Sequence, residues 1–336
     1  MKTGVLLINL GTPAAANKKA VRRYLKEFLD DPRVIDLPWW IRKPLLHLFI
    51  LPFRPKQSAK AYAAIWDEET GSPLLFHTQQ LGEKLQAQLP AHYQVEIGMR
   101  YGEPSIASAL NKLFQAQCQK IILLPLFPQY SSAATGSAIA KCLQVLQARQ
   151  KIPAIKIIPS FYQDSHYITA KVATIAPWLE RTQPDCVLFS YHSLPQRHLT
   201  HSQNPCLVPC AQNQSCPQDI QHCYRAQCYD TSRLLAEKLN LNASHYEVVF
   251  QSRLGRTVWV GPEIQQVMAQ LRQRGVNNLL VVCPSFVADC LETLEEIGIR
   301  AKEHWQTLGG KHFNLVPCLN TEPSWVNNLA QFILSA

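Results

Sequence analysis

A histidine stands at the end of a run of residues that reads as a buried strand. The run CVLFSYH, at 186–192, is apolar until its last residues, and a polar segment with a proline follows it. If the run is a parallel strand, His192 lies at its carboxyl end, where open α/β sheets bind their ligands. A neutral imidazole there can accept a proton or bind a metal near neutral pH. The structural alternative is a loop histidine that hydrogen-bonds a backbone carbonyl.

Acidic residues open a predicted helix after a second apolar run, LLVVCPSF. In FVADCLETLEEIGI, at 286–299, spacings of three and four residues place Asp289, Glu292 and Glu296 on one helical face. Carboxylates stacked in this way can take protons or guide a hard cation. Asp289 and Glu292 also fit a capping box, a pattern that would make them structural instead.

Cysteines form the third candidate. Five of the eleven cysteines fall within one polar, proline-containing segment, at Cys206, Cys210, Cys216, Cys223 and Cys228. Such a segment is too polar to bury them as core residues, so the pattern favours ligation of a metal or an iron–sulfur cluster. The spacing does not match a paired C-x-x-C zinc site, but thiolates suit both zinc and iron, and the metal stays open.

Eight short apolar runs alternate with helical patterns and would position these residues. The runs lie at 4–11, 95–101, 120–128, 154–161, 186–192, 246–252, 278–286 and 313–320. Their nearly continuous apolar character is typical of parallel strands that are covered on both faces. The sequence therefore predicts an α/β protein with doubly wound parallel sheets.

The chain also contains a loose internal repeat. IILLPLFPQYS at 121–131 and LLVVCPSFVAD at 279–289 share a strand that ends in a proline followed by a phenylalanine. We expect two similar Rossmann-like halves, each with a four-stranded sheet, at 1–165 and 166–336. A cleft between such halves would be the default ligand site.

The positive charge is concentrated near the amino terminus. Residues 1–60 hold twelve Lys and Arg but four Asp and Glu, in a chain of formal net charge +9. The same region contains LPWWIRKPLLHLFILPFRP, where aromatic and aliphatic residues alternate with cations. This combination predicts that a lip at about 37–66 contacts an anionic membrane surface peripherally. No apolar run is long enough to span a bilayer.

Several function classes lose support. The sequence has no G-x-x-x-x-G-K-S/T loop, no G-x-G-x-x-G after the first strand and no G-x-S-x-G. The basic region lacks a nucleic-acid-binding motif. An odd number of cysteines without a convincing export signal indicates a cytoplasmic protein. A homodimer stays open.

Six motifs together resemble the ferrochelatases over essentially the whole chain. They are LLINLGTP, PQYSSAATGS, FSYHSLPQRH, FQSRLG, WVGP and FVADCLETLEEI. The resemblance implies a lyase that inserts Fe²⁺ into a free-base porphyrin, either protoporphyrin IX or coproporphyrin III, to give haem. Because a planar porphyrin must bend and lose two N–H protons before a metal enters, the enzyme has to supply strain and a base.

The resemblance also implies roles for particular residues. His192 would be the proton acceptor or a ligand of the substrate iron, Glu292 its carboxylate partner, and Glu296 a further group on the path of metal or proton. A second set would line the macrocycle pocket: Leu10, Arg100, Tyr101, Tyr130, Ser131, Trp259 and Phe286. Two departures stand out, because Ala63 and Ala64 replace an arginine available to a propionate and Cys290 replaces a histidine.

Many ferrochelatases carry a [2Fe–2S] cluster, often with ligands near the carboxyl terminus. No cysteine follows Cys318 here, so we expect the ligands to be Cys206, Cys210, Cys216 and Cys223, with Cys228 as the alternative. Three other functions remain at this point: a cobalt or nickel chelatase for another tetrapyrrole, a non-catalytic tetrapyrrole-binding protein, and an iron–sulfur redox protein.

Overall fold

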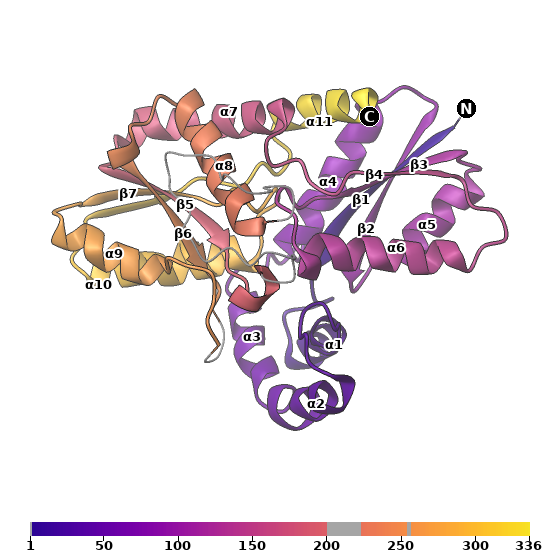
Figure 1. Cartoon of the computed structure of the whole chain (residues 1–336), viewed down its shortest axis with the longest axis horizontal. Helices are drawn as coiled ribbons and strands as arrows, with labels where there is room; N and C mark the ends of the chain where they lie inside the picture. The colour runs from indigo at the N-terminus through magenta and orange to yellow at the C-terminus, as the bar shows by residue number, and fades with distance from the viewer. Residues whose placement is uncertain (1, 200–222, 254–256) are drawn as a thin grey trace. The chain divides into compact units, whose positions relative to one another are not determined.

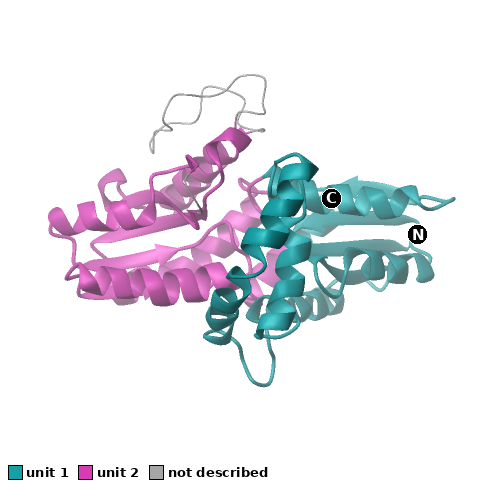
Figure 2. Cartoon of the chain, turned by 90° about the horizontal axis from the view of Figure 1, so that it is seen from below, with its two compact units in different colours: residues 1–127, 131–160, 330–336 teal, residues 128–130, 161–329 magenta. Residues whose placement is uncertain are grey.

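The computed structural model describes residues 2–199, 223–253 and 257–336. The chain folds into two compact units. Unit 1 comprises residues 1–127, 131–160 and 330–336, and unit 2 comprises residues 128–130 and 161–329 (Figure 2). Each unit is built on its own four-stranded sheet, so the expected pair of similar α/β halves is confirmed.

Unit 1 has the strand order β2-β1-β3-β4, with every neighbouring pair parallel. Its strands are β1 (Thr3–Gly11), β2 (Tyr93–Tyr101), β3 (Lys120–Pro125) and β4 (Ala154–Ile157). Its helices are α1 (Lys18–Leu29), α2 (Trp39–Pro44), α3 (Arg54–Ala63), α4 (Pro73–Gln88), α5 (Ile106–Gln115) and α6 (Ser137–Gln147), with π-helical segments η1 (Leu45–Ile50) and η2 (Ser132–Gly136).

Unit 2 repeats this plan with the order β6-β5-β7-β8, again all parallel. Its strands are β5 (Cys186–His192), β6 (Tyr246–Gln251), β7 (Asn278–Val282) and β8 (His312–Leu315). Its helical elements are α7 (Ser165–Thr182), η3 (Gln196–Leu199), α8 (Tyr224–Lys238), η5 (Ala243–His245), α9 (Ile264–Gln273), the π-helix η6 (Leu291–Ala301), α10 (Lys302–Thr307) and α11 (Pro323–Ser335), whose last residues count with unit 1.

Both faces of each sheet are buried, which explains the continuous apolar runs. In unit 1, Leu6 and Ile8 of β1 pack against α5 and α6, while the alternate residues Val5 and Leu7 are equally buried. In unit 2, α7 and α8 lie on one side of the sheet and α9 and α10 on the other (Figure 1). A strand between two helical layers needs apolar side chains at every position, not at alternate ones.

Strand ends differ from the prediction by a few residues. The run 120–128 ends as a strand at Pro125 and the run 278–286 ends at Val282. Leu126 and Cys283 are nevertheless buried. The apolar pattern therefore marks burial correctly and overestimates the length of the hydrogen-bonded ladder.

Candidate functional site

His192 is the last residue of β5 and is partly exposed. Its Nδ1 lies 2.5 Å from the carbonyl oxygen of Ser193. A carbonyl oxygen can only accept, so Nδ1 donates in this contact and carries a hydrogen; in the tautomer with one ring hydrogen, Nε2 is then the nitrogen with a free lone pair. The Tyr224 hydroxyl donates to the His192 carbonyl at 2.8 Å and fixes the backbone beneath the ring. The alternative of a loop histidine that hydrogen-bonds a backbone carbonyl is therefore met at Nδ1, and the role of proton acceptor stays a prediction.

Glu292 lies in the first turn of η6, the segment that follows β7. A capping box opens this helix, but it runs from Cys290 to Thr293 and not from Asp289 to Glu292. Asp289 instead accepts hydrogen bonds from Cys318 N, Thr293 Oγ1 and Asn320 Nδ2. The sequence pattern for the cap was therefore wrong by one residue, and Glu292 is not used as a capping group.

Glu296 is held by Ser252, the residue that follows β6. The backbone N–H of Ser252 donates to Glu296 Oε1 at 2.8 Å, and the Ser252 hydroxyl donates to Oε2 at 2.6 Å. Both carboxylate oxygens therefore already accept a hydrogen bond from a neutral donor.

Gln251 connects the two candidate catalytic elements and was not singled out from the sequence. It pairs with His192 in the parallel register of β5 and β6, and its side-chain Nε2 donates to the Glu292 carbonyl at 2.8 Å. Gln251 stands at the end of the apolar run YEVVF, as His192 stands at the end of its own run. That shared position is the signal that could have found it.

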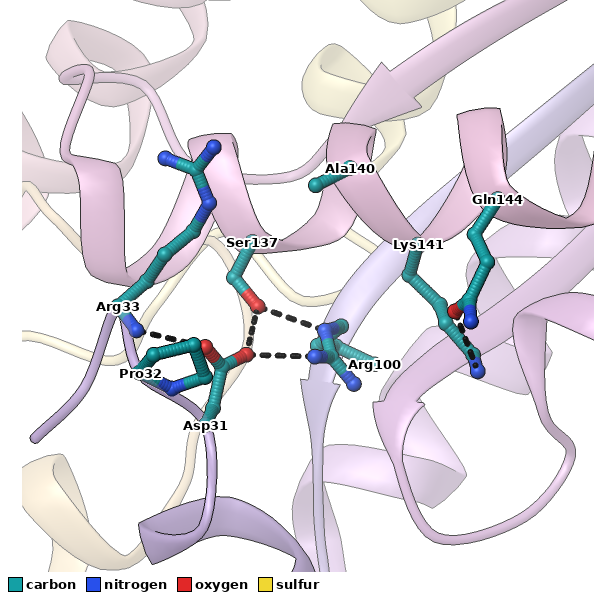
Figure 3. A pocket seen from close by; sticks show the side chains of 8 residues that line it. All are labelled: Asp31, Pro32, Arg33, Arg100, Ser137, Ala140, Lys141 and Gln144. Atoms are coloured by element: carbon teal, nitrogen blue, oxygen red, sulfur yellow. Dashed lines mark hydrogen bonds and ion pairs between the residues drawn. The ribbon is translucent and has the colours of Figure 1, made fainter. Parts of the chain in front are cut away.

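Unit 1 carries a buried charge network at the corresponding edge of its sheet. Arg100 and Ser137 both contact the Asp31 carboxylate at 2.5 Å, and the Tyr101 hydroxyl donates to it at 2.9 Å. Figure 3 shows Asp31 between Ser137 and Arg100 in an open pocket whose other lining residues are Pro32, Arg33, Ala140, Lys141 and Gln144. Asp31 was not expected from the sequence, although it belongs to an acidic pair within a basic region.

The network shifts the pKa values of its members. Burial alone would raise the pKa of Asp31, but hydrogen bonds from Ser137, Arg33 N and Tyr101, with the charge of Arg100, outweigh it and hold the pKa below its usual value. Burial raises the pKa of the Tyr101 hydroxyl, so it stays protonated and donates to Asp31. Asp31 is therefore an ionised carboxylate matched to one guanidinium.

The residues expected to line a macrocycle pocket occupy varied environments. Tyr101 is fully buried and Ser131 nearly so, whereas Leu10, Tyr130, Trp259 and Phe286 are partly exposed. Ser131 is the N-cap of η2, where its hydroxyl accepts from Ala134 N. Phe286 packs against the core of unit 2, and its carbonyl accepts from the buried Lys171.

The proposed cluster ligands fall largely outside the described residues. Cys206, Cys210 and Cys216 lie there, whereas Cys223 is the N-cap of α8 and Cys228 is fully buried in that helix. Among the described residues, no group of three or more His, Cys, Asp or Glu side chains could hold a metal ion. Burial raises the pKa of the Cys142 and Cys186 thiols to about 12.

The basic, apolar lip folds as α2, η1 and α3. Trp39, Trp40, Phe49 and Phe53 are each more than 60% exposed, and Leu48 is 64% exposed. Leu46 is fully buried and Arg42 nearly so, and Arg42 donates to the Leu37 carbonyl. In the part of the chain that the structure describes, no helix is both long enough and apolar enough to cross a membrane.

Comparison with known proteins settles the family. The sequence profile described as Ferrochelatase matches residues 2–336. The chain is 51% identical to a ferrochelatase of Legionella pneumophila over 99% of both chains, and 50% identical to one of Coxiella burnetii over 98% of this chain and 92% of the relative. The chain belongs to the ferrochelatase family. Membership makes it a lyase of haem and porphyrin biosynthesis, a metal chelatase whose substrates are ferrous iron and a porphyrin.

Solved structures show the same fold at low identity. The structure described as SirB from Bacillus subtilis with Fe³⁺ matches all of this ferrochelatase chain and 95% of its own, with a TM-score of 0.54 and 13% identity. CbiX, described as the terminal enzyme of sirohaem biosynthesis in denitrifying bacteria, matches with a TM-score of 0.51 and 13% identity. The enzyme assignment excludes the alternatives of a non-catalytic carrier and a redox protein.

Proposed function

We propose that this ferrochelatase inserts Fe²⁺ into protoporphyrin IX or coproporphyrin III with His192 as the proton acceptor and Glu292 as its carboxylate partner. The observation that carries the proposal is the hydrogen bond from His192 Nδ1 to the Ser193 carbonyl. It leaves Nε2 as the basic atom of a ring at the carboxyl end of a parallel strand, where α/β sheets bind ligands.

Proton removal has a simple balance in this scheme. The free-base ring loses two N–H protons as Fe²⁺ binds its four nitrogens. Nε2 of His192 takes the first proton, releases it to solvent and then takes the second. Glu292, partly exposed in the first turn of η6, supplies a negative charge that stabilises the resulting imidazolium. Leu10, Arg100, Tyr101, Tyr130, Ser131, Trp259 and Phe286 are proposed to hold the macrocycle, and Glu296 to continue the acidic path.

One anaerobic assay tests both the substrate and the residues. Purified protein is mixed with Fe²⁺ and either protoporphyrin IX or coproporphyrin III, and the metalloporphyrin spectrum is followed. We expect His192→Ala and Glu292→Gln to lose turnover by about 10²-fold or more and to keep porphyrin binding. Near-normal turnover of His192→Ala would overturn its role, and faster insertion of Co²⁺ or Ni²⁺ by the wild type would favour the rival chelatase.

The exposed lip supports a second proposal, a peripheral contact with the inner face of an anionic membrane from the cytoplasm. Trp39, Trp40, Phe49 and Phe53 present their side chains to solvent beside Lys43 and Arg54. Apolar side chains beside cations are suited to the headgroup region, and the electrostatic part of the binding weakens with salt.

Vesicle sedimentation tests the membrane contact. Wild-type protein should sediment with vesicles that contain phosphatidylserine, and Trp40→Ser with Phe49→Ser should reduce the bound fraction. Ile152→Ser is the matched control, because Ile152 is 56% exposed but lies outside the lip. Equal binding of the control and the double variant, or no binding at low salt, would overturn the proposal.

We also propose a [2Fe–2S] cluster on Cys206, Cys210, Cys216 and Cys223, with Cys228 as the alternative ligand. A partly exposed Cys223 at the start of α8 supports it, since Cys223 directly follows the cysteine-rich segment in the sequence. Four thiolates are what such a cluster needs. Cys228 is fully buried in α8.

The cluster is tested by colour, metal content and spectroscopy. Anaerobically purified protein should absorb in the visible and give an electron paramagnetic resonance signal after reduction. Cys216→Ser should lose both, whereas Cys228→Ser should keep them. If the protein is colourless and contains stoichiometric zinc, the cluster proposal is wrong and the cysteines hold zinc instead.

A further inference from the structure

Gln251 is a buried amide whose polar atoms are all used. It is 1% exposed. Its Nε2 donates to the Glu292 carbonyl at 2.8 Å, its Oε1 accepts from the Ser190 hydroxyl at 2.7 Å, and its backbone carbonyl accepts from Ser193 N at 2.8 Å. A buried amide is costly unless its hydrogen bonds are made, and here they are made.

These contacts join two separate elements. Ser190 and Ser193 flank His192 at the end of β5, and Glu292 belongs to η6. Gln251 is also the residue that pairs with His192 in the sheet register. The Gln251 side chain therefore links the Ser190 hydroxyl, two residues before His192, to the backbone carbonyl of Glu292.

Ser252 extends the contact by one turn of η6. Its φ is +68°, a left-handed conformation that residues other than glycine adopt rarely. In this conformation the backbone N–H and the side-chain hydroxyl reach opposite oxygens of the same Glu296 carboxylate, at 2.8 and 2.6 Å. The strained backbone is thus associated with a specific two-point contact.

The helix that receives these bonds is of an uncommon type. η6 is π-helical over all of Leu291–Ala301, whereas π-helices usually occur as single turns. Gln251 and Ser252 contact this uncommon segment at two points one turn apart, Glu292 and Glu296.

We propose that Gln251 and Ser252 are positioning residues, a clamp that holds η6 against the end of β5 so that Glu292 keeps a fixed place relative to His192 during metal insertion. The proposal rests on the roles of His192 and Glu292 given above. Neither clamp residue need touch the porphyrin or the metal. They act through the backbone of Glu292 and the carboxylate of Glu296.

The test separates positioning from general stability. Gln251→Met keeps the length of the side chain and removes its hydrogen bonds with Glu292, Ser190 and Cys283, and Ser252→Ala removes the hydroxyl alone. Thr231→Val is the matched control, because Thr231 is fully buried in unit 2 and donates to the Tyr162 and Gln227 carbonyls, away from η6. Stability, porphyrin affinity and steady-state kinetics are measured for all three.

We expect Gln251→Met to lower kcat at least tenfold and Ser252→Ala to lower it about threefold to tenfold, with porphyrin affinity within twofold of wild type. Ser252→Asn should recover most of the loss, because asparagine tolerates the left-handed backbone and offers an amide donor to Glu296. Thr231→Val should lose stability and keep kcat.

Two outcomes would overturn the clamp. One is a kcat for Gln251→Met and Ser252→Ala no lower than that of Thr231→Val, and the other is an equal loss in Ser252→Ala and Ser252→Asn. If Gln251→Met does not fold, Ser252→Ala decides, because Ser252 is only partly buried. His192→Ala and Glu292→Gln distinguish failure of the clamp from failure of the proposed catalytic roles. If these two variants keep normal turnover, the catalytic roles are refuted, whatever the kinetics of the Gln251 and Ser252 variants.

Discussion

The two units share a topology but differ at the carboxyl edges of their sheets. Asn9 pairs with Met99 and Gly11 with Tyr101, which leaves Leu10 beside Arg100 in unit 1, whereas His192 pairs with Gln251 in unit 2. The correspondence extends to the helix after the third strand, which begins with a π-helical segment in both units.

The difference lies in what the paired residues do. In unit 1 the residue near the carboxyl end of the first strand is the apolar Leu10, and Arg100 on the neighbouring strand forms an ion pair with the buried Asp31. In unit 2 the corresponding position is His192, and its register partner Gln251 is neutral. A repeated scaffold can therefore carry a matched ion pair at this edge in one half and a histidine beside a neutral amide in the other, so the backbone plan alone does not fix the side-chain chemistry of the edge.

The largest effect is expected when unit 2 receives the residue of unit 1. His192→Leu should lower turnover by about 10² to 10⁴-fold, the range for loss of a general base, and leave the fold intact. The double variant with Leu10→His should stay inactive, because unit 1 offers no equivalent of Glu292 on a clamped helix. Recovery of iron insertion in the double variant would show the edges to be interchangeable.

The opposite exchange should affect stability. Arg100→Gln gives unit 1 the residue of unit 2 and leaves the Asp31 carboxylate, 4% exposed, without its guanidinium. We expect the free energy of unfolding to fall by about 3–5 kcal/mol in urea titrations. Arg253→Gln removes an exposed ion pair with Glu263 in unit 2 and should cost about 0–1 kcal/mol. Similar losses of unfolding free energy in Arg100→Gln and Arg253→Gln would show that the buried ion pair of unit 1 is no more important for stability than an exposed one.

The same network predicts a pH dependence. Because the folded-state pKa of Asp31 lies below its usual value, its stabilising effect is present in full above the unfolded-state pKa of about 3.9 and is lost as the pH falls through the folded value. The difference in unfolding free energy between wild type and Asp31→Asn should stay constant from about pH 7 to 5 and shrink below that. A difference that grows in acid would reverse the assigned sign.

The smallest effect concerns the caps of the two π-helices. Ser131 caps η2 through its hydroxyl, whereas the cap of η6 is a cysteine. Ser131→Ala should lower the unfolding free energy by about 1 kcal/mol, and Ser131→Thr should restore it. Calorimetry would detect the change, and no loss in Ser131→Ala would show that the hydroxyl does not cap the helix.

The strands could be predicted because each is buried on both faces. All eight apolar runs contain a strand, and the order of strands within each sheet repeats as the internal similarity suggested. The π-helices could not be predicted, since a shift in hydrogen-bonding from the fourth to the fifth residue leaves little trace in the apolar pattern.

Only residues that carry their own chemistry could be chosen as site candidates from the sequence. His192 and Glu292 attract notice because imidazole and carboxylate groups can exchange protons and because both follow strands of one sheet, and their roles stay predictions. Gln251 and Ser252 are neutral, and their importance depends on contacts between segments about 40 to 60 residues apart. Asp31 depends likewise on Arg100 and Ser137, which are 69 and 106 residues away. Such pairings follow from tertiary structure and not from local pattern.

The burial of the core cysteines makes the protein suitable for selective chemical labelling. A thiol whose pKa is about 12, as for Cys142 and Cys186, is thiolate in only about one molecule in ten thousand at pH 8, and alkylating reagents attack the thiolate. Cys283, Cys290 and Cys318 are also buried, with raised pKa values. Brief treatment of the native protein with iodoacetamide should leave these five cysteines unmodified, so the mass added to the chain would report on the remaining thiols, without any need to replace the core cysteines first.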